Sequence, residues 1–200
     1  MRDLSKTALV LIGFQNDYFA DDGILHAVIE ESAKVTGALK NTLRLIDNAG
    51  EDFGLVISTP IIFTENYEEL SDAVGILETI KDVGAFKAGS KGAETIDQLA
   101  PYRQLITEVP GKRGLNAFSN TELENLLRRH NIEEVMLAGA VTSVCIDSTG
   151  RHAAELGFKV AVLSDCTSGR TSFEQDFYCE SIFPLYGSVL QHTGLLTETA

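Results

Sequence analysis

The sequence predicts a single α/β domain of three layers, with helices on both faces of a Rossmann-like, doubly wound and mainly parallel sheet. Short apolar runs alternate with amphipathic helical patterns along the chain, which is typical of right-handed βαβ crossovers. The 200 residues are 44% hydrophobic, which is enough for one buried core. No linker, internal repeat or low-complexity tract is evident, so we predict one domain over residues 1–200.

The first half of the chain is predicted to supply two strands, a helix and a cap. Residues 7–12 (TALVLI) form a continuous apolar run, which favours a central strand buried on both faces. Apolar residues at steps of three and four predict a helix over 31–48, and residues 53–58 (FGLVIS) predict a second strand. Residues 59–101 carry irregularly placed glycines and charges, so we expect a loop-rich cap over the strand ends.

The second half repeats the alternation of strand and helix. Asn120 is a plausible N-cap for a helix with apolar residues on one face. By the same criteria we expect strands over 105–109, 134–138 and 159–163, and helices over 120–129, 143–156 and 172–183.

The composition argues against nucleic-acid and membrane partners. The chain has 16 basic and 29 acidic residues, which gives a net charge of -13. The overall electrostatic field therefore repels a nucleic-acid backbone or an anionic membrane surface. The N-terminus lacks the apolar segment of a signal peptide, and no run approaches the roughly 18 apolar residues of a membrane span. Three cysteines without a CxxC pair indicate reduced thiols. We therefore expect a soluble, cytoplasmic protein.

Three loops are the candidate sites of chemistry, because ligands of a doubly wound sheet collect at the carboxyl ends of its strands. They are 13–19 (GFQNDYF), 110–118 (PGKRGLNAF) and 139–145 (GAVTSVC). Cys145 is predicted to lie in the first turn of a helix, where free N–H groups and the helix dipole favour the nucleophilic thiolate and could hold an oxyanion. The alternative is a small buried hydrophobic residue without a chemical role.

Lys112 stands in the second of these loops, from which an ammonium group could reach the strand ends. The alternative is an ordinary solvated lysine. Ile106 and Arg113 break the pattern of a phosphate-binding loop, and no G-x-G-x-x-G dinucleotide motif occurs. The four histidines are dispersed, without metal-binding spacing, so we predict no metal and no cofactor.

Taken together, the three loops resemble the isochorismatase-like cysteine hydrolases. TALVLIGFQNDYF is similar to the opening strand and loop of that family, GKRGLNAF to its lysine segment, and GAVTSVCIDST to the segment that holds its nucleophile. GAFKAGSKGAE in the cap and GFKVAVLSD after the nucleophile also fit, so the resemblance runs from about Thr7 to Phe183. It implies the isochorismatase-like hydrolase fold and a homo-oligomer that acts on a small-molecule substrate.

The resemblance also implies an activity and a set of site residues. Members of the family hydrolyse amides and related C–N bonds through a thioester, using an Asp-Lys-Cys triad. Position by position, the nucleophile would be Cys145 and the charge-stabilising lysine Lys112. Backbone N–H groups near Val141, Thr142 and Cys145 would bind the oxyanion, around a cis peptide bond preceding Val141. Phe19 would form part of the substrate wall.

The resemblance breaks at Gly13, which occupies the place of the catalytic aspartate. Asp17 matches a structural aspartate of the family's Q-N-D-F pattern and is not expected to replace the missing group. Two hypotheses stay open: a hydrolase of small amides with Cys145 as nucleophile, and a catalytically weak or inactive member that binds a small molecule or a protein partner. Replacing Gly13 by Asp should raise turnover, unless Gly13 has a positive φ that aspartate resists.

Overall fold

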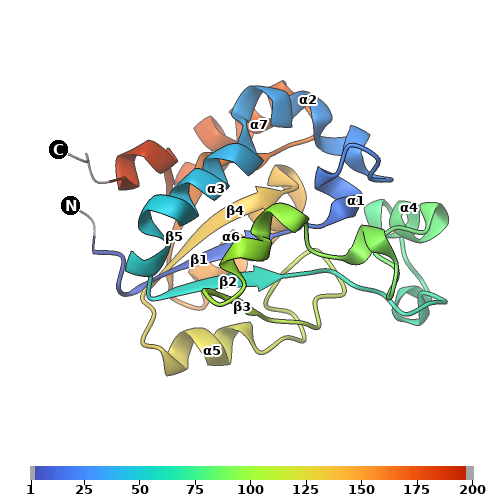
Figure 1. Ribbon diagram of the computed structural model, residues 1–200, viewed down its shortest axis with the longest axis horizontal. Helices are drawn as coiled ribbons and strands as arrows, with labels where there is room; N and C mark the ends of the chain where they lie inside the picture. Colours follow the sequence, from blue (N-terminus) through green and yellow to red (C-terminus); the bar gives the residue numbers. More distant parts are fainter. Residues whose placement is uncertain (1–2, 197–200) are drawn as a thin grey trace.

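The computed structural model describes residues 3–196, which form one sheet of six parallel strands (Figure 1). The strand order is β3-β2-β1-β4-β5-β6, and every neighbouring pair is parallel. The strands are β1 (Thr7–Ile12), β2 (Leu55–Thr59), β3 (Ile106–Glu108), β4 (Glu134–Ala140), β5 (Lys159–Ser168) and β6 (Ser188–Leu190). The order reverses between β1 and β4, and the carboxyl ends of these two strands therefore mark the switch point at which such sheets bind ligands.

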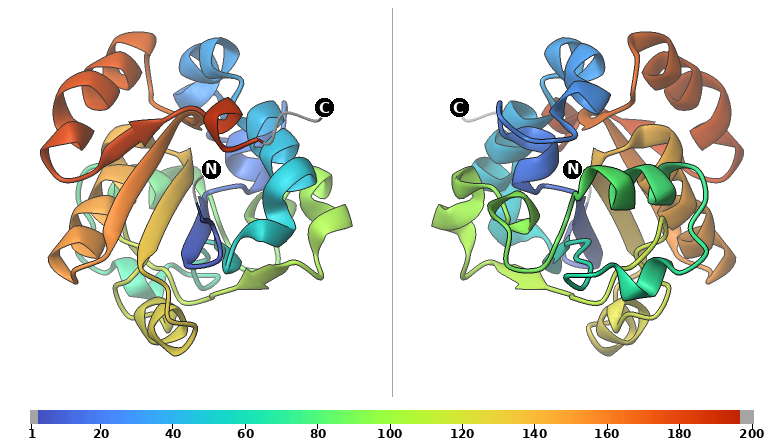
Figure 2. Two further views of the ribbon diagram at one scale, coloured as in Figure 1. Left: turned by 90° about the vertical axis from the view of Figure 1, so that its left-hand side faces the viewer. Right: turned by 90° about the vertical axis from the view of Figure 1, so that its right-hand side faces the viewer.

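Helices cover both faces of the sheet, as Figure 2 shows, which confirms the predicted three-layer fold. They are α1 (Asn16–Phe19), α2 (His26–Thr36), α3 (Ala38–Ala49), α4 (Ile76–Val83), α5 (Leu123–Arg129), α6 (Asp147–Glu155) and α7 (Ser172–Phe177). Strand β1 is buried along its whole length, and its residues alternate between two clusters. Val10 belongs to the cluster that contains α5 and α6, whereas Leu9 and Leu11 belong to the cluster that contains α3.

The structure divides the predicted helix over 31–48 into α2 and α3. Gly37 separates them with a φ of +67°, and its N–H closes α2 by donating to the Ala33 carbonyl. Glycine adopts this left-handed conformation without the steric cost of a Cβ atom. The apolar spacing of Val35, Leu39 and Leu43 continues through the break, so periodicity alone does not indicate it.

Further elements differ from the sequence-based prediction. Helix α5 begins at Leu123 and not at the expected N-cap Asn120, which has a φ of +59°, and α7 ends at Phe177 and not at residue 183. Strand β6 was not predicted, because its three half-buried residues form no continuous apolar run. The cap over 59–101 is loop-rich as expected, but it also contains α4, which begins after Gly75 and ends at Gly84, both with positive φ. Within residues 3–196, every helix is too short or too polar to cross a membrane.

A close approach between β1 and β4 shapes the switch point. Gly139, near the end of β4, has a φ of +121°, and a Cβ atom there would lie 1.8 Å from the carbonyl oxygen of Ile12. Only glycine allows the two backbones to come this close. The loops that follow β1 and β4 consequently start side by side.

Candidate active site

Cys145 lies at the carboxyl end of β4, in a π-helical turn over Thr142–Ile146 that leads into α6. This turn stands where the sequence predicted the first turn of an α-helix. The N–H groups of Val144 and Ile146 both donate to the Val141 carbonyl, at 3.0 and 3.2 Å. The Cys145 side chain is buried, and its sulfur faces a small cavity at the switch point.

Lys112 is fully buried beside this sulfur, so its interpretation as a solvated surface lysine is wrong. The residue is 1% exposed, and its backbone forms an isolated bridge with Ile61 beyond the end of β2. Its Nζ donates to the Gly114 carbonyl at 2.6 Å and to the Cys145 Sγ at 3.5 Å. A buried ammonium group costs free energy unless it is paired, and a thiolate at this distance pairs it. The ammonium group of Lys112 thus lies in direct contact with the sulfur of Cys145.

The cavity in front of Cys145 is small and mainly apolar. Its volume is about 10 Å³, which is near the least space that holds one water molecule. Among its lining residues Cys145, Lys112 and Tyr18 carry polar side-chain atoms, while the remaining side chains are aliphatic. The lining residues are Ile12, Gly13, Tyr18, Ile61, Ile76, Leu77, Ile80, Lys112, Leu115, Ala140, Val144 and Cys145. Three of these come from α4, so the cap closes the cavity.

The opposite wall is formed by Gly13 and Tyr18. Gly13 has a φ of +72°, and a Cβ atom there would lie 2.9 Å from the Ala140 carbonyl oxygen and 3.3 Å from Cδ2 of Tyr18. The Tyr18 ring is 3% exposed and packs on Phe86, with centroids 5.1 Å apart. Burial raises the pKa of Tyr18, and a charge on Cys145 raises it further, so the phenol stays protonated.

Phe19, assigned by the resemblance to the substrate wall, does not line this cavity. Its ring stacks on Phe14 at 4.7 Å and borders a separate surface groove beside α2 and α3. The preceding residue, Tyr18, takes the position in the wall. The sequence did contain a signal for it, since the fourth residue of the Q-N-D-F pattern falls on Tyr18 and not on Phe19. Asp17 is buried, and its Oδ2 accepts from the Phe86 N–H at 2.6 Å, which is a structural role.

Val141 and Thr142 are both fully buried and do not line the cavity with their side chains. The peptide bond between Ala140 and Val141 is cis, which confirms that expectation from the resemblance. Any contribution of these two residues to an oxyanion site must come from their backbone, because the Thr142 hydroxyl donates away from the cavity to Gln175 Oε1, at 2.5 Å.

Two residues of α7, which the sequence did not single out, hold the loop that carries Cys145. Glu174 accepts from the Ser143 hydroxyl at 2.6 Å, and Gln175 accepts from Thr142. The Gln175 amide in turn donates to the Ser164 carbonyl at 2.9 Å, which links the loop to β5. These bonds fix the position of the loop that carries Cys145.

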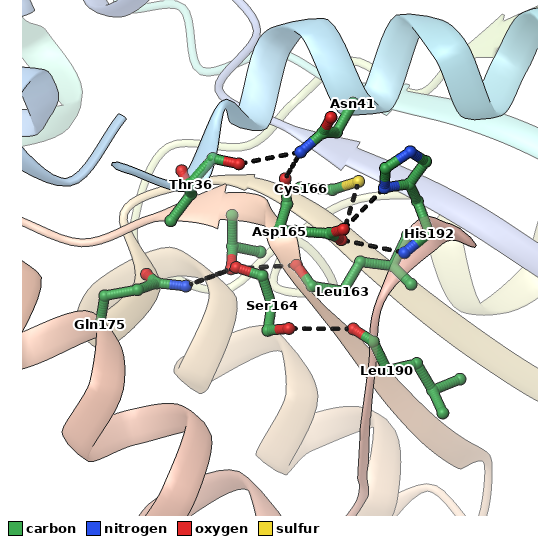
Figure 3. A network of polar contacts seen from close by, with 10 residues as sticks. Thr36, Asn41, Leu163, Ser164, Asp165, Cys166, Gln175, Leu190 and His192 are labelled. Carbon is green, nitrogen blue, oxygen red and sulfur yellow. Dashed lines mark hydrogen bonds and ion pairs between the residues drawn. The ribbon is translucent and has the colours of Figure 1, made fainter. Parts of the chain in front are cut away.

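A second polar cluster lies on β5 and the turn that follows β6, and Figure 3 shows it around the Asp165 carboxylate. Its two oxygens accept from His192 Nδ1 at 2.6 Å, from the His192 N–H at 2.9 Å and from the Cys166 thiol at 3.7 Å. Asp, Cys and His are potential metal ligands, but metal binding requires a thiolate, and burial raises the pKa of Cys166. We interpret the cluster as a structural tie between the turn and the sheet.

The fold and this site define a doubly wound α/β protein with a buried thiol and a buried ammonium group in contact at the switch point. Residues 7–194 match the model of the Isochorismatase domain family, and the chain belongs to that family.

Known relatives cover nearly the whole chain. The isochorismatase family protein YwoC of Bacillus subtilis is 26% identical over 185 residues, 92% of this chain and 89% of the relative. Maleamate amidohydrolase of Pseudomonas putida is 27% identical over 194 residues, 96% of this chain and 86% of the relative. A cysteine hydrolase from Pseudomonas syringae has a similar structure, with a TM-score of 0.81 and 20% identity over 97% of this chain and 92% of that one.

Proposed function

We propose that this protein is a hydrolase that cleaves a C–N bond of a small amide or related carbonyl substrate through a thioester on Cys145. The observation that carries the proposal is the 3.5 Å contact between Lys112 Nζ and Cys145 Sγ, inside a closed cavity at the switch point. The similarity to the maleamate amidohydrolase of P. putida agrees with it.

The proposed chemistry follows from the groups around the sulfur. The Cys145 thiolate attacks the substrate carbonyl, and the N–H groups near Val141, Thr142 and Cys145 stabilise the oxyanion that forms. Lys112 offsets the negative charge of both the thiolate and the intermediate. The amine then leaves, and water hydrolyses the thioester.

The cavity lining narrows the substrate class. Lys112 supplies its one cationic side chain, and that group is already held by Gly114 and Cys145. A substrate carboxylate would therefore have to share this ammonium group with Gly114 and Cys145, whereas an uncharged acyl group would pack on aliphatic side chains. Since the cavity holds about one water molecule, Ile76 and Leu77 of α4 must move when a substrate enters. We infer a small, uncharged, largely apolar acyl group.

Mass spectrometry after incubation with a panel of small amides and activated esters tests the proposal. We expect a covalent acyl group on Cys145 in the wild type, none in Cys145→Ser under the same conditions, and unchanged labelling in the matched control Cys179→Ser. We also expect the wild type and Cys179→Ser to release amine from the amide, and Cys145→Ser to release none. Binding of panel members without acylation or turnover would favour the second hypothesis, a binding protein with an inherited pocket, which the glycine at position 13 supports.

We also propose a homo-oligomer in the cytoplasm. Phe173 and Phe177 of α7 stack on each other at 6.1 Å while remaining 78% and 45% exposed, and Leu185 is 73% exposed. Exposed aromatic groups of this kind favour association. The three cysteines are free thiols, which suits a reducing compartment. Light scattering of the purified protein, with Phe173→Ser as a variant, measures the oligomeric state.

A further inference from the structure

The wall of the catalytic cavity contains a phenol that the proposed reaction does not yet use. Tyr18 occupies the space next to Gly13, since a Cβ atom on residue 13 would lie 3.3 Å from its Cδ2 and 3.5 Å from its Cε2. The backbone of Tyr18 is held by a bond from its N–H to the Gln15 carbonyl at 3.1 Å, and its ring by Phe86. The Tyr18 ring is thus fixed beside residue 13, the position at which the family resemblance places an acidic side chain.

The hydroxyl of Tyr18 is available for a substrate. Among the described residues that line the cavity, Tyr18, Lys112 and Cys145 have side-chain protons that can be exchanged. Two of the three Lys112 ammonium protons are engaged with Gly114 and Cys145, and the aliphatic residues have none to give. No hydrogen bond within the described part of the chain engages the Tyr18 phenol, whose residue bonds only through its backbone.

We propose that the Tyr18 hydroxyl donates the proton to the leaving nitrogen, performing from α1 the role that the resemblance assigns to the residue at position 13. This inference rests on the proposed amide hydrolysis. It makes Tyr18 a catalytic residue in direct contact with the reacting atoms, and it explains how a site with Gly13 can expel an amine.

The proton transfers balance over one turnover. In the first half, the C–S bond forms, the C–N bond breaks, and the Tyr18 O–H proton passes to the departing nitrogen, leaving a phenolate. In the second half, a water molecule gives a proton back to this phenolate as its oxygen attacks the thioester, and the Cys145 thiolate leaves with the S–C electron pair. The net reaction is amide plus water giving acid plus amine.

Electrostatics favour this timing. Burial, and after it a charge on Cys145, raises the pKa of Tyr18 in the resting state and keeps the proton on the phenol. Bond formation to the carbonyl turns the thiolate into a neutral sulfur, so this repulsion is gone when the amine leaves. The Lys112 ammonium group, in the same cavity, then stabilises the phenolate.

The test compares Tyr18→Phe with wild type on two probes that share an acetyl group, p-nitroacetanilide and p-nitrophenyl acetate. The amide needs a proton on its leaving nitrogen, whereas p-nitrophenolate leaves without one. We expect amide turnover to fall at least about 100-fold, the range for a lost acid–base group, while the burst of p-nitrophenol that reports Cys145 acylation stays within about threefold. Tyr67→Phe is the matched control, because it also removes a buried hydroxyl, one that donates to the Ala85 carbonyl outside the cavity.

Each outcome decides the question. Selective loss of amide turnover, with an unchanged thermal melt and an unchanged rate of Cys145 alkylation, supports the inference. Equal amide turnover in both proteins, or an equal fall on amide and ester, overturns it while leaving the proposed hydrolase in place. A wild type that neither cleaves either probe nor forms an acetyl-Cys145 adduct overturns the proposed function and this inference together.

Discussion

Introducing a side chain at Gly13 is predicted to destabilise the protein, and the structure indicates by how much. The residue has a φ of +72°, a region in which an L-residue costs roughly 1–2 kcal/mol. Its Cβ would also lie 2.9 Å from the Ala140 carbonyl oxygen and 3.3 Å from the Tyr18 ring. Overpacking of this kind costs about 1–3 kcal/mol. The two contributions together amount to about 2–5 kcal/mol of the free energy of unfolding.

Thermal and urea melts of Gly13→Ala and Gly13→Asp measure this cost. For a chain of this length, 1 kcal/mol lowers Tm by roughly 2–4 °C, so we expect a fall of about 4–20 °C. Gly89→Ala is the matched control, because Gly89 has nearly the same φ, +76°, with no other atom within 4 Å of its Cβ position. That control isolates the backbone cost and should lower Tm by only about 2–8 °C.

The conformation of Gly13 also affects the turnover expected of the Gly13→Asp variant. The gain in turnover expected for Gly13→Asp depended on a φ that aspartate accepts, and the observed φ does not meet this condition. We therefore expect no increase in kcat/KM for the folded Gly13→Asp protein on small amides. A Gly13→Ala variant as stable as Gly89→Ala would refute the steric argument, and a more active Gly13→Asp would show that the cavity accommodates a carboxylate.

Three further predictions concern the nucleophile and its support. Lys112→Met keeps a side chain of similar length but removes the ammonium group. It should slow Cys145 alkylation and lower turnover by about 100-fold or more, as for other lost electrostatic donors. Unchanged alkylation and turnover would remove Lys112 from the site. At pH 8, iodoacetamide should modify Cys145 well before Cys179, because burial raises the pKa of Cys179 to about 12 and leaves roughly one part in 10,000 as thiolate. Cys179 labelling, followed by peptide mass spectrometry, should rise about tenfold per pH unit towards pH 12, and a plateau near pH 9 would contradict the shift. Gln175→Leu should cost about 1–3 kcal/mol in urea melts and lower kcat more than it raises KM, since Thr142 loses its acceptor; an unchanged kcat would restrict Gln175 to a structural role.

Much of the fold could be predicted from the sequence because buried parallel strands leave a strong pattern. Strand β1 coincides with the apolar run TALVLI, and β4 and β5 begin where the apolar runs begin. The parts that were missed lack such a pattern. Gly37 acts through its backbone conformation, and β6 is stabilised by its pairing with β5 rather than by its own composition.

The site was partly predictable for a related reason. Cys145 and Lys112 stand in loops at the carboxyl ends of strands, and parallel topology brings such loops together. Glu174 and Gln175 could not be found in this way, because they act from a helix behind the loop through single hydrogen bonds. Phe19 lies outside this cavity, whereas the preceding residue on α1, Tyr18, lines it.

Gly13 and Tyr18 are best understood as one feature of the cavity. A side chain at position 13 and the ring at position 18 compete for the same volume, because the hypothetical Cβ already contacts two atoms of that ring. Gly13 leaves room for the ring to lie against the β1–β4 switch point, and Phe86 supports it from the cap. The glycine at position 13 and the buried phenol at position 18 therefore depend on each other for space beside Cys145.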